Sequence, residues 1–130
     1  MLRASKFSLD IHSATMYNPP MIEKELIAAS TAPLILSLLS KRESYGYELI
    51  QEVKRLSQGD IAWTDGMLYP VLHRMERKGW IKSRWVEIAN GRKRKYYGIK
   101  KRGDDALKAK REQWNAIRSI FNGLWRERYV

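Results

Sequence analysis

The chain has 130 residues, and its shares of 44% apolar and 30% charged residues are ordinary for one globular domain. It contains no cysteine, which excludes disulfide scaffolds, cysteine-ligated metal centres and thiol nucleophiles. Its longest nearly apolar stretch, residues 32–39, is far shorter than the roughly 20 residues that span a bilayer. With 25 Lys and Arg against 14 Asp and Glu, the net charge is +11, and the expected partner is a polyanion.

The positive charge is concentrated in one part of the chain. Residues 82–111 contain 12 basic and 3 acidic side chains, so most of the excess lies in under a quarter of the sequence. An evenly spread excess would indicate a solvated surface, whereas a concentrated one is typical of a nucleic-acid footprint.

Residues 1–20 show neither helical nor strand periodicity and end in Asn18-Pro19-Pro20, which blocks a helix. They lack the continuous apolar run of a secretory signal, and Asp10 argues against an organelle-targeting segment. We therefore expect a disordered N-terminal extension over residues 1–20, with Met21 as an alternative start.

Helical periodicity begins after this extension. Apolar spacing predicts a short helix over residues 22–27 and a second helix that ends near residue 41. Pro33 fits the first turn of that second helix, because its missing N–H has no partner there in any case, and Ser30 or Thr31 would cap it.

Two more helices are expected, each followed by a glycine. One covers residues 45–56 and ends at Gly59, and the other runs from residue 64 or 65 to residue 78, where Gly79 ends it. Pro70 lies about five residues inside the latter, which predicts a local kink or a late start.

A β-hairpin is expected next, over residues 80–88 and 95–99, both rich in β-branched and aromatic side chains. Asn90-Gly91 between two such runs is a strong hairpin signal. The tryptophans around the first strand, and the one before the preceding helix, are expected to pack on the apolar side of this hairpin: Trp63, Trp80 and Trp85.

A long helix over residues 104–128 should close the chain. An apolar seam at alternating spacings of three and four runs along it, formed by Leu107, Trp114, Ile117, Phe121 and Leu124. Such a seam needs a partner surface, so we expect residues 21–100 to form one domain and residues 101–130 to form a helix that makes a homodimer. Two interpretations of Trp114 stay open: interface core, or the wall of a pocket for a flat aromatic effector.

The element order predicts a mainly α fold with a small β-hairpin, the winged helix-turn-helix, whose helix over residues 64–78 enters a DNA major groove. The residues expected to contact DNA from this helix are Thr64, Gly66, Tyr69, Pro70, His73, Arg74 and Arg77. Arg74 has an alternative role, which is to pair with Glu48 or Glu76 and brace the helix. Four basic residues expected at the hairpin tip would contact phosphates or the minor groove: Arg92, Lys93, Arg94 and Lys95.

Three ordered motifs add a resemblance. Tyr-Gly-Tyr-Glu-Leu stands at residues 45–49, and Gly-Met-Leu-Tyr-Pro-Val-Leu-His-Arg-Met-Glu stands at residues 66–76. A wing motif, Gly-Arg-Lys-Arg-Lys-Tyr-Tyr, stands at residues 91–97 with one extra basic residue. From about Leu34 to Trp125 the chain resembles the PadR family of bacterial and archaeal transcriptional regulators. The resemblance implies a dimeric winged-helix repressor with a C-terminal dimerisation helix, often released from its operator by a small molecule.

Two positions depart from the family pattern. Met67 stands where Thr or Ser is usual, which removes a hydroxyl that could contact a phosphate. Lys100 stands where Thr would cap the last helix, so we expect Asp104 or Asp105 to support that helix start by charge.

No motif for an enzyme is present: there is no Gly-rich phosphate loop, HExxH pair or nucleophile elbow, and no cofactor or metal is expected. The sequence therefore predicts a cytoplasmic, nucleoid-associated regulator that binds double-stranded DNA at an inverted repeat and has no membrane partner. One competing hypothesis is an architectural nucleic-acid-binding protein without sequence preference or effector. Another is a module whose basic face binds an acidic protein.

Overall fold

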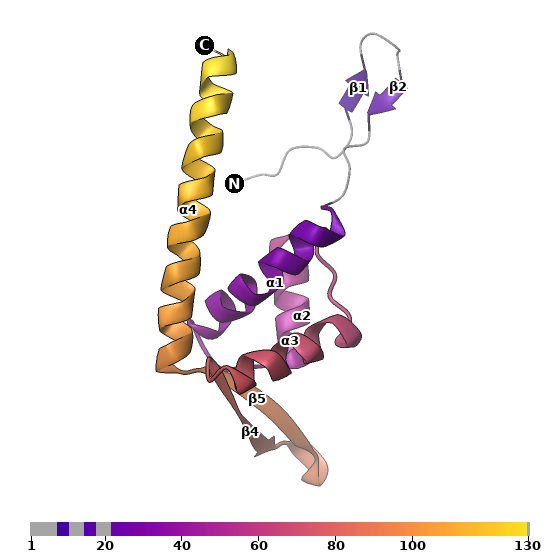
Figure 1. The fold of residues 1–130 in the computed structure, drawn as a ribbon. Coiled ribbons are helices and arrows are strands. Elements are labelled where there is room, and N and C mark those ends of the chain that lie inside the picture. The colour runs from indigo at the N-terminus through magenta and orange to yellow at the C-terminus, as the bar shows by residue number, and fades with distance from the viewer. Residues whose placement is uncertain (1–7, 11–14, 18–21, 130) are drawn as a thin grey trace.

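The computed structural model describes residues 8–10, 15–17 and 22–129 (Figure 1). Four helices and a small sheet make up the body: α1 (Lys24–Leu39), β3 (Ser44–Tyr45), α2 (Gly46–Leu56), α3 (Asp65–Arg77), β4 (Ile81–Glu87), β5 (Lys93–Ile99) and α4 (Lys101–Tyr129). The mainly α fold with a hairpin is confirmed. Within residues 22–129, no helix is both long enough and apolar enough to cross a membrane.

The first helical region is one continuous helix, where two were expected. The hydroxyls of Ser30 and Thr31 donate to the carbonyl oxygens of Leu26 and Ile27, each at 2.7 Å, so they lie inside the helix and cap nothing. Pro33 is accommodated mid-helix, although its missing N–H leaves one carbonyl of the preceding turn without its helical donor. Burial of four residues of α1 outweighs that loss: Thr31, Ile35, Leu36 and Leu39.

The helix-turn-helix pair, α2 and α3, follows the predicted bounds closely. Thr64 caps α3, its side-chain oxygen accepting a hydrogen bond from the N–H of Met67 at 3.2 Å. Gly79 ends it with φ +75°, and the N–H of Trp80 bonds back to the carbonyl of Met75 at 3.0 Å. The helix begins at Asp65 despite Pro70, so the late start was wrong.

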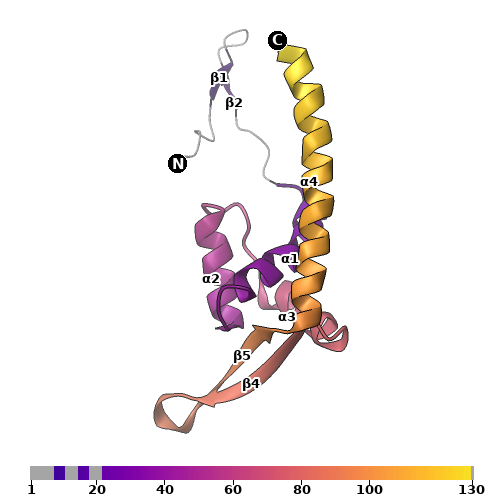
Figure 2. The ribbon, with the colours of Figure 1, turned by 90° about the vertical axis from the view of Figure 1, so that its left-hand side faces the viewer.

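The sheet has three antiparallel strands in the order β3-β5-β4, one more than expected. β3 is only two residues long and pairs at the base of the hairpin, Ser44 with Tyr97 and Tyr45 with Tyr96. β4 and β5 pair from Ile81↔Ile99 to Glu87↔Lys93, and the strands continue well beyond β3. This free part of the hairpin is the wing, and it projects from the body (Figures 1 and 2).

One apolar core holds these elements together. Every helix and both long strands contribute, and Trp63 on the α2–α3 connection is buried in it instead of packing on the wing as expected. The remaining members are Ile35, Leu36, Leu39, Leu49, Val53, Ile61, Leu68, Leu72, Met75, Ile81, Tyr97 and Leu107.

The last helix starts at Lys101, three residues before the expected position. Asp104 donates its N–H to the carbonyl of Lys100, while the Lys101 ammonium pairs with Asp105 at 2.8 Å. Gly103 lies directly against the strand base, because a Cβ there would lie 2.1 Å from the carbonyl oxygen of Trp80. The helix therefore leaves the base of the wing in backbone contact and extends past α1 to the opposite end of the molecule (Figure 1).

Two short strands precede the body. β1 (Ser8–Asp10) and β2 (Thr15–Tyr17) pair antiparallel, with Leu9 opposite Met16, in a region where only disorder was expected. Hydrogen bonds between three residues on each side suffice for this pair, although so short a ladder adds little stability. The other residues of the extension expected over residues 1–20 lie outside the described residues, and so does Met21.

Candidate nucleic-acid interface

The recognition helix α3 separates a buried side from an exposed one. Leu68, Leu72 and Met75 lie in the core, and the helical period places most of the other residues on the opposite side. All of the residues predicted to contact DNA from this helix are exposed: Thr64, Gly66, Tyr69, Pro70, His73, Arg74 and Arg77. Met67, which replaces the usual hydroxyl residue, is exposed beside them.

Tyr69 has a second role that the sequence did not indicate. Its ring lies against Gly46, the first residue of α2, and a Cβ at Gly46 would lie 2.5 Å from the Tyr69 hydroxyl. The glycine of the Tyr-Gly-Tyr-Glu-Leu motif therefore makes room for the tyrosine of the Leu-Tyr-Pro motif. The two motifs therefore meet where α2 begins, beside the exposed side of α3.

Both predicted partners of Arg74 are engaged elsewhere. Glu48 pairs with Arg42 at 3.4 Å, and Glu76 accepts a hydrogen bond from the Ser83 hydroxyl at 2.9 Å. Arg74 is exposed on α3. Among its two interpretations, the geometry therefore favours the ligand contact.

The wing tip differs from the expectation in one important way. Only Arg92 lies in the turn, where Asn90 and Gly91 have φ +61° and +73°, whereas Lys93, Arg94 and Lys95 belong to β5. Because side chains alternate across a strand, these three cannot form one cluster. Arg92 and Lys93 are exposed, and the other two are partly buried by aromatic neighbours.

Arg94 belongs to a ladder on the outer face of the wing, the face away from α3. Its guanidinium lies 4.0 Å from the ring centroid of Tyr45, which packs edge-on against Tyr96 at 5.4 Å. Arg84 continues the ladder and donates two hydrogen bonds to Glu43, at 2.8 and 2.9 Å. This hydrogen-bonded pair lowers the pKa of Glu43 below its ordinary value.

Lys95 lies on the inner face of the wing, which faces α3. Its ammonium is 3.9 Å from the Glu76 carboxylate and 5.5 Å from the ring centroid of Tyr97. Through Ser83 and Lys95, Glu76 links the recognition helix to both strands. Tyr97 is fully buried below this link, and the loss of hydration, reinforced by the charge of Glu76, raises its pKa to about 12.

Comparison with known proteins fits this arrangement. Residues 35–109 match the model of the transcriptional regulator PadR-like family, which is more than half of the chain. The chain belongs to the PadR-like family. Its members are DNA-binding transcriptional regulators, and the winged helix-turn-helix of this PadR-like regulator fits that class.

Several solved structures share the fold. A transcriptional regulator from Clostridium thermocellum is 31% identical with a TM-score of 0.71, over 78% of this chain and 95% of that one. A PadR family regulator from Clostridium difficile is 34% identical with a TM-score of 0.62, over 73% and 97%. Transcriptional regulator YqjI of Escherichia coli is 34% identical over 84 residues, which are 65% of this chain but only 39% of that protein.

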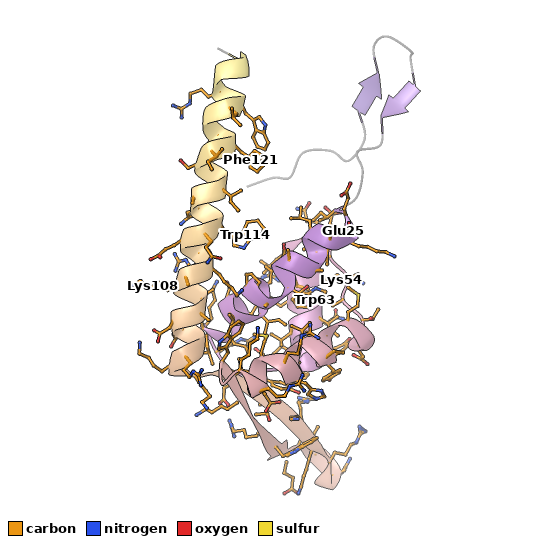
Figure 3. The ribbon with its side chains drawn as sticks, viewed as in Figure 1. Glu25, Lys54, Trp63, Lys108, Trp114 and Phe121 are labelled. Atoms are coloured by element: carbon orange, nitrogen blue, oxygen red, sulfur yellow. The ribbon has the colours of Figure 1, made fainter. Side chains whose placement is uncertain are left out.

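The PadR-like regulator has a second exposed surface, an apolar one, on α4. Leu107 is 9% exposed because it packs into the core of its own chain, so it is not part of a free seam. The other four predicted seam residues are exposed by 38–57%: Trp114, Ile117, Phe121 and Leu124. Trp114 and Phe121 project from α4 on the side of α1, and Lys108 projects on the other side (Figure 3).

Two further apolar residues of α4 were missed by the heptad pattern. Trp125 stacks on Phe121 with ring centroids 5.0 Å apart, and Ile120 is also exposed. Each stands next to a residue of the seam, Ile120 before Phe121 and Trp125 after Leu124, so the heptad positions did not include them. We call the exposed apolar set the α4 patch: Trp114, Ile117, Ile120, Phe121, Leu124 and Trp125.

A cavity of about 480 Å³ lies between α1 and α4, beside the α4 patch. Its apolar wall includes Pro33, Leu34, Leu107 and Trp114, and its polar wall includes Lys110 and Arg118. It places Trp114 where a bound molecule could stack on the indole face.

Two tryptophans remain, Trp80 just before β4 and Trp85 within it. The ammonium groups of Lys78 and Lys110 lie 4.6 and 5.3 Å from the ring centroid of Trp80, which is partly buried. Trp85, expected to pack on the wing, is instead among the most exposed apolar residues of the described chain. It lies too far along the hairpin for the body to cover it.

Proposed function

We propose that this PadR-like regulator is a homodimeric, sequence-specific repressor of transcription, which acts in the cytoplasm on chromosomal DNA. The observation that carries the proposal is the α4 patch, because it exposes a line of large apolar side chains that a partner surface would bury. A second copy of α4 offers the same line, and two-fold pairing of identical surfaces is the commonest way to close such an assembly.

A dimer of this kind would bind DNA with two copies of α3. Two-fold symmetry relates them, so the operator would be an inverted repeat whose half-sites lie about one helical turn, or 34–36 Å, apart. Tyr69 lies in the first half of α3 and His73 lies one turn before Arg77, so Tyr69 and His73 suit base contacts and Arg77 at the C-terminal end suits a phosphate.

The cavity between α1 and α4 would hold a small aromatic effector. Trp114 lies both in its wall and in the α4 patch, so a ligand stacked there would contact the dimer interface directly. Binding that favours one packing of the two α4 helices over another would change the separation of the two α3 helices and release the operator.

Selection of binding sites from a random duplex library, followed by titration of the selected duplex, tests the DNA part of the proposal. The expected result is an inverted repeat bound about 10³-fold or more tightly than bulk competitor DNA at physiological salt. A ratio near one would instead support an architectural role without sequence preference. Loss of all duplex binding at that salt would support the protein-interaction hypothesis.

Transcription in vitro from a promoter that carries the selected site tests the sign of regulation. The regulator should lower transcript yield, and a site moved away from the promoter serves as the control. Activation would contradict repression while leaving DNA recognition intact. A screen of small aromatic compounds for restored transcription, repeated with Trp114→Ala, then tests the effector site.

A further inference from the structure

The wing carries one large apolar side chain that neither the core nor the proposed dimer interface uses. Trp85 is 64% exposed, although an indole is among the side chains with most to gain from burial. The α4 patch cannot cover it within one molecule, because the wing and the distal end of α4 lie at opposite ends of the structure (Figure 1).

The position of Trp85 on the hairpin is fixed by strand alternation. Ile81, Ser83 and Trp85 share the inner face of β4. Ile81 is buried in the core and Ser83 bonds to Glu76 of α3, so Trp85 is the first residue of that face to extend beyond the body. It continues the surface that begins with the exposed side of α3.

One cation lies close to the indole, and two more lie further along the wing. Trp85 is paired across the strands with Lys95, whose ammonium lies 5.8 Å from the ring centroid, and Lys93 follows on the same face opposite Glu87. Arg92 adds a charge at the turn. An exposed indole next to basic side chains suits a ligand that has both apolar surface and many negative charges. The walls of a DNA groove have this chemistry, because apolar sugar edges alternate there with phosphates.

We infer that Trp85 contacts DNA, with its indole packed into the minor groove next to each half-site while Arg92 and Lys93 neutralise the groove phosphates. This inference rests on the proposed binding of duplex DNA by α3 and the wing. Proteins that enter the minor groove commonly combine basic side chains with apolar wedges. The Trp85 contact would add affinity that does not depend on salt, because no charge is involved.

Trp85→Ala and Trp85→Phe, titrated with the duplex selected above over a range of salt concentrations, test the inference. Trp85→Ala should weaken binding roughly tenfold, the loss expected for one aromatic contact with a nucleotide, without changing the slope of log K against log salt. Trp85→Phe should recover part of the loss. Leu56→Ala is the matched control, since Leu56 is 56% exposed on α2 away from the wing, and it should bind like the wild type.

A compound that fills the minor groove tests where Trp85 contacts the duplex. On a duplex saturated with netropsin, which occupies the minor groove, wild type and Trp85→Ala should bind equally. In protein labelled with 5-fluorotryptophan, the fluorine resonance that is lost in Trp85→Phe should shift when the untreated duplex is added.

Three results would overturn the inference. Equal affinity of Trp85→Ala and wild type for the untreated duplex would show that the indole contributes nothing. A changed salt slope would show that the variant acts by displacing Lys95, and a difference that persists with netropsin would place the contact outside the minor groove. Failure of the wild type to bind any duplex would instead contradict the proposed function.

Discussion

The winged body buries its apolar side chains, whereas the distal half of α4 exposes them. In the body, Leu68, Leu72 and Met75 of α3 are buried by neighbouring elements of the same chain. On α4, the last apolar residue buried in this way is Leu107, and from Trp114 onward the apolar residues are exposed. Burial of such side chains is the main favourable contribution to folding. The body therefore contains the partners it needs, whereas the distal half of α4 leaves its apolar residues unburied in the described chain.

The same contrast separates two kinds of basic residue. Lys95 and Arg94 lie against aromatic rings near the body, whereas Arg92 and Lys93 at the far end of the wing are exposed. Charges held by the fold stabilise the wing, and charges left exposed are available to phosphates. Distance from the body therefore separates the basic residues that pack on rings from those that stay exposed.

Breaking the α4 patch should have the largest effect. Ile117→Glu together with Phe121→Glu places two charges in the proposed interface and should give monomers by light scattering. Operator affinity should then fall by about 10²- to 10⁴-fold, because two linked half-site contacts become one. Lys108→Glu also introduces a negative charge, but on the other side of α4, and should leave a dimer. A dimeric double variant would show that another surface mediates assembly.

Removing the exposed charges of the wing should have the next largest effect. Arg92→Ala and Lys93→Ala should weaken specific and non-specific binding by similar factors, and each should flatten the slope of log K against log salt by about 0.9. Lys54→Ala, on the C-terminal turn of α2, is the control and should leave the slope unchanged. A new base preference without a change of slope would mean that the wing reads sequence.

Arg94→Ala sharpens the same comparison. Because Arg94 stacks on Tyr45, its removal should lower the melting temperature while changing the salt slope less than Arg92→Ala does. Thermal melts and salt titrations of the two variants side by side measure this difference. The reverse ranking would mean that the outer face of the wing contacts DNA.

Changes on α3 should alter specificity more than affinity. His73→Ala should relax base preference at two symmetric positions, by up to about 1–3 kcal/mol of discrimination, and leave binding to bulk DNA nearly unchanged. Binding-site selection with the variant measures this. An unchanged preferred sequence would mean that His73 reads no base.

The smallest predicted effect is on the pH dependence of folding stability, and it comes from the buried Tyr97 below the wing. Tyr97 keeps its proton to about pH 12 in the folded chain but only to about pH 10 when unfolded. The folded state therefore binds more protons between these values, and stability should fall as pH rises through that range, by at most about 1.4 kcal/mol per pH unit. Chemical denaturation of Tyr97→Phe should show a weaker decline, whereas identical declines would contradict the shift.

The sequence was most informative where one residue has one structural role. Gly79 and the hydroxyl of Thr64 mark the ends of α3 because a left-handed residue and an N-cap have few substitutes. Pro33 led to the wrong prediction of a helix start, because tertiary burial can hold a proline inside a helix. β3 could not be recognised, since two residues carry no periodicity.

The candidate site was predicted in composition more than in arrangement. The four adjacent basic residues of the wing were identified, but the strand period divides them between two faces and places two of them against Tyr45 and Glu76. Leu107 fits the heptad as well as Phe121 does, and only the packing of α4 against α1 decides that it faces the core. Trp85 was assigned to packing because a sequence does not show how far the body extends along a hairpin.

The contact between Gly46 and Tyr69 has a consequence for how this chain can evolve. The absent Cβ of one residue is the space occupied by the hydroxyl of the other, so each position limits what selection accepts at its partner. A lineage that replaced Tyr69 by a short side chain would be free to acquire alanine at position 46, whereas one that retained tyrosine would accept it only if the ring moved aside. The two positions should therefore covary among descendants, although 22 residues separate them in the chain.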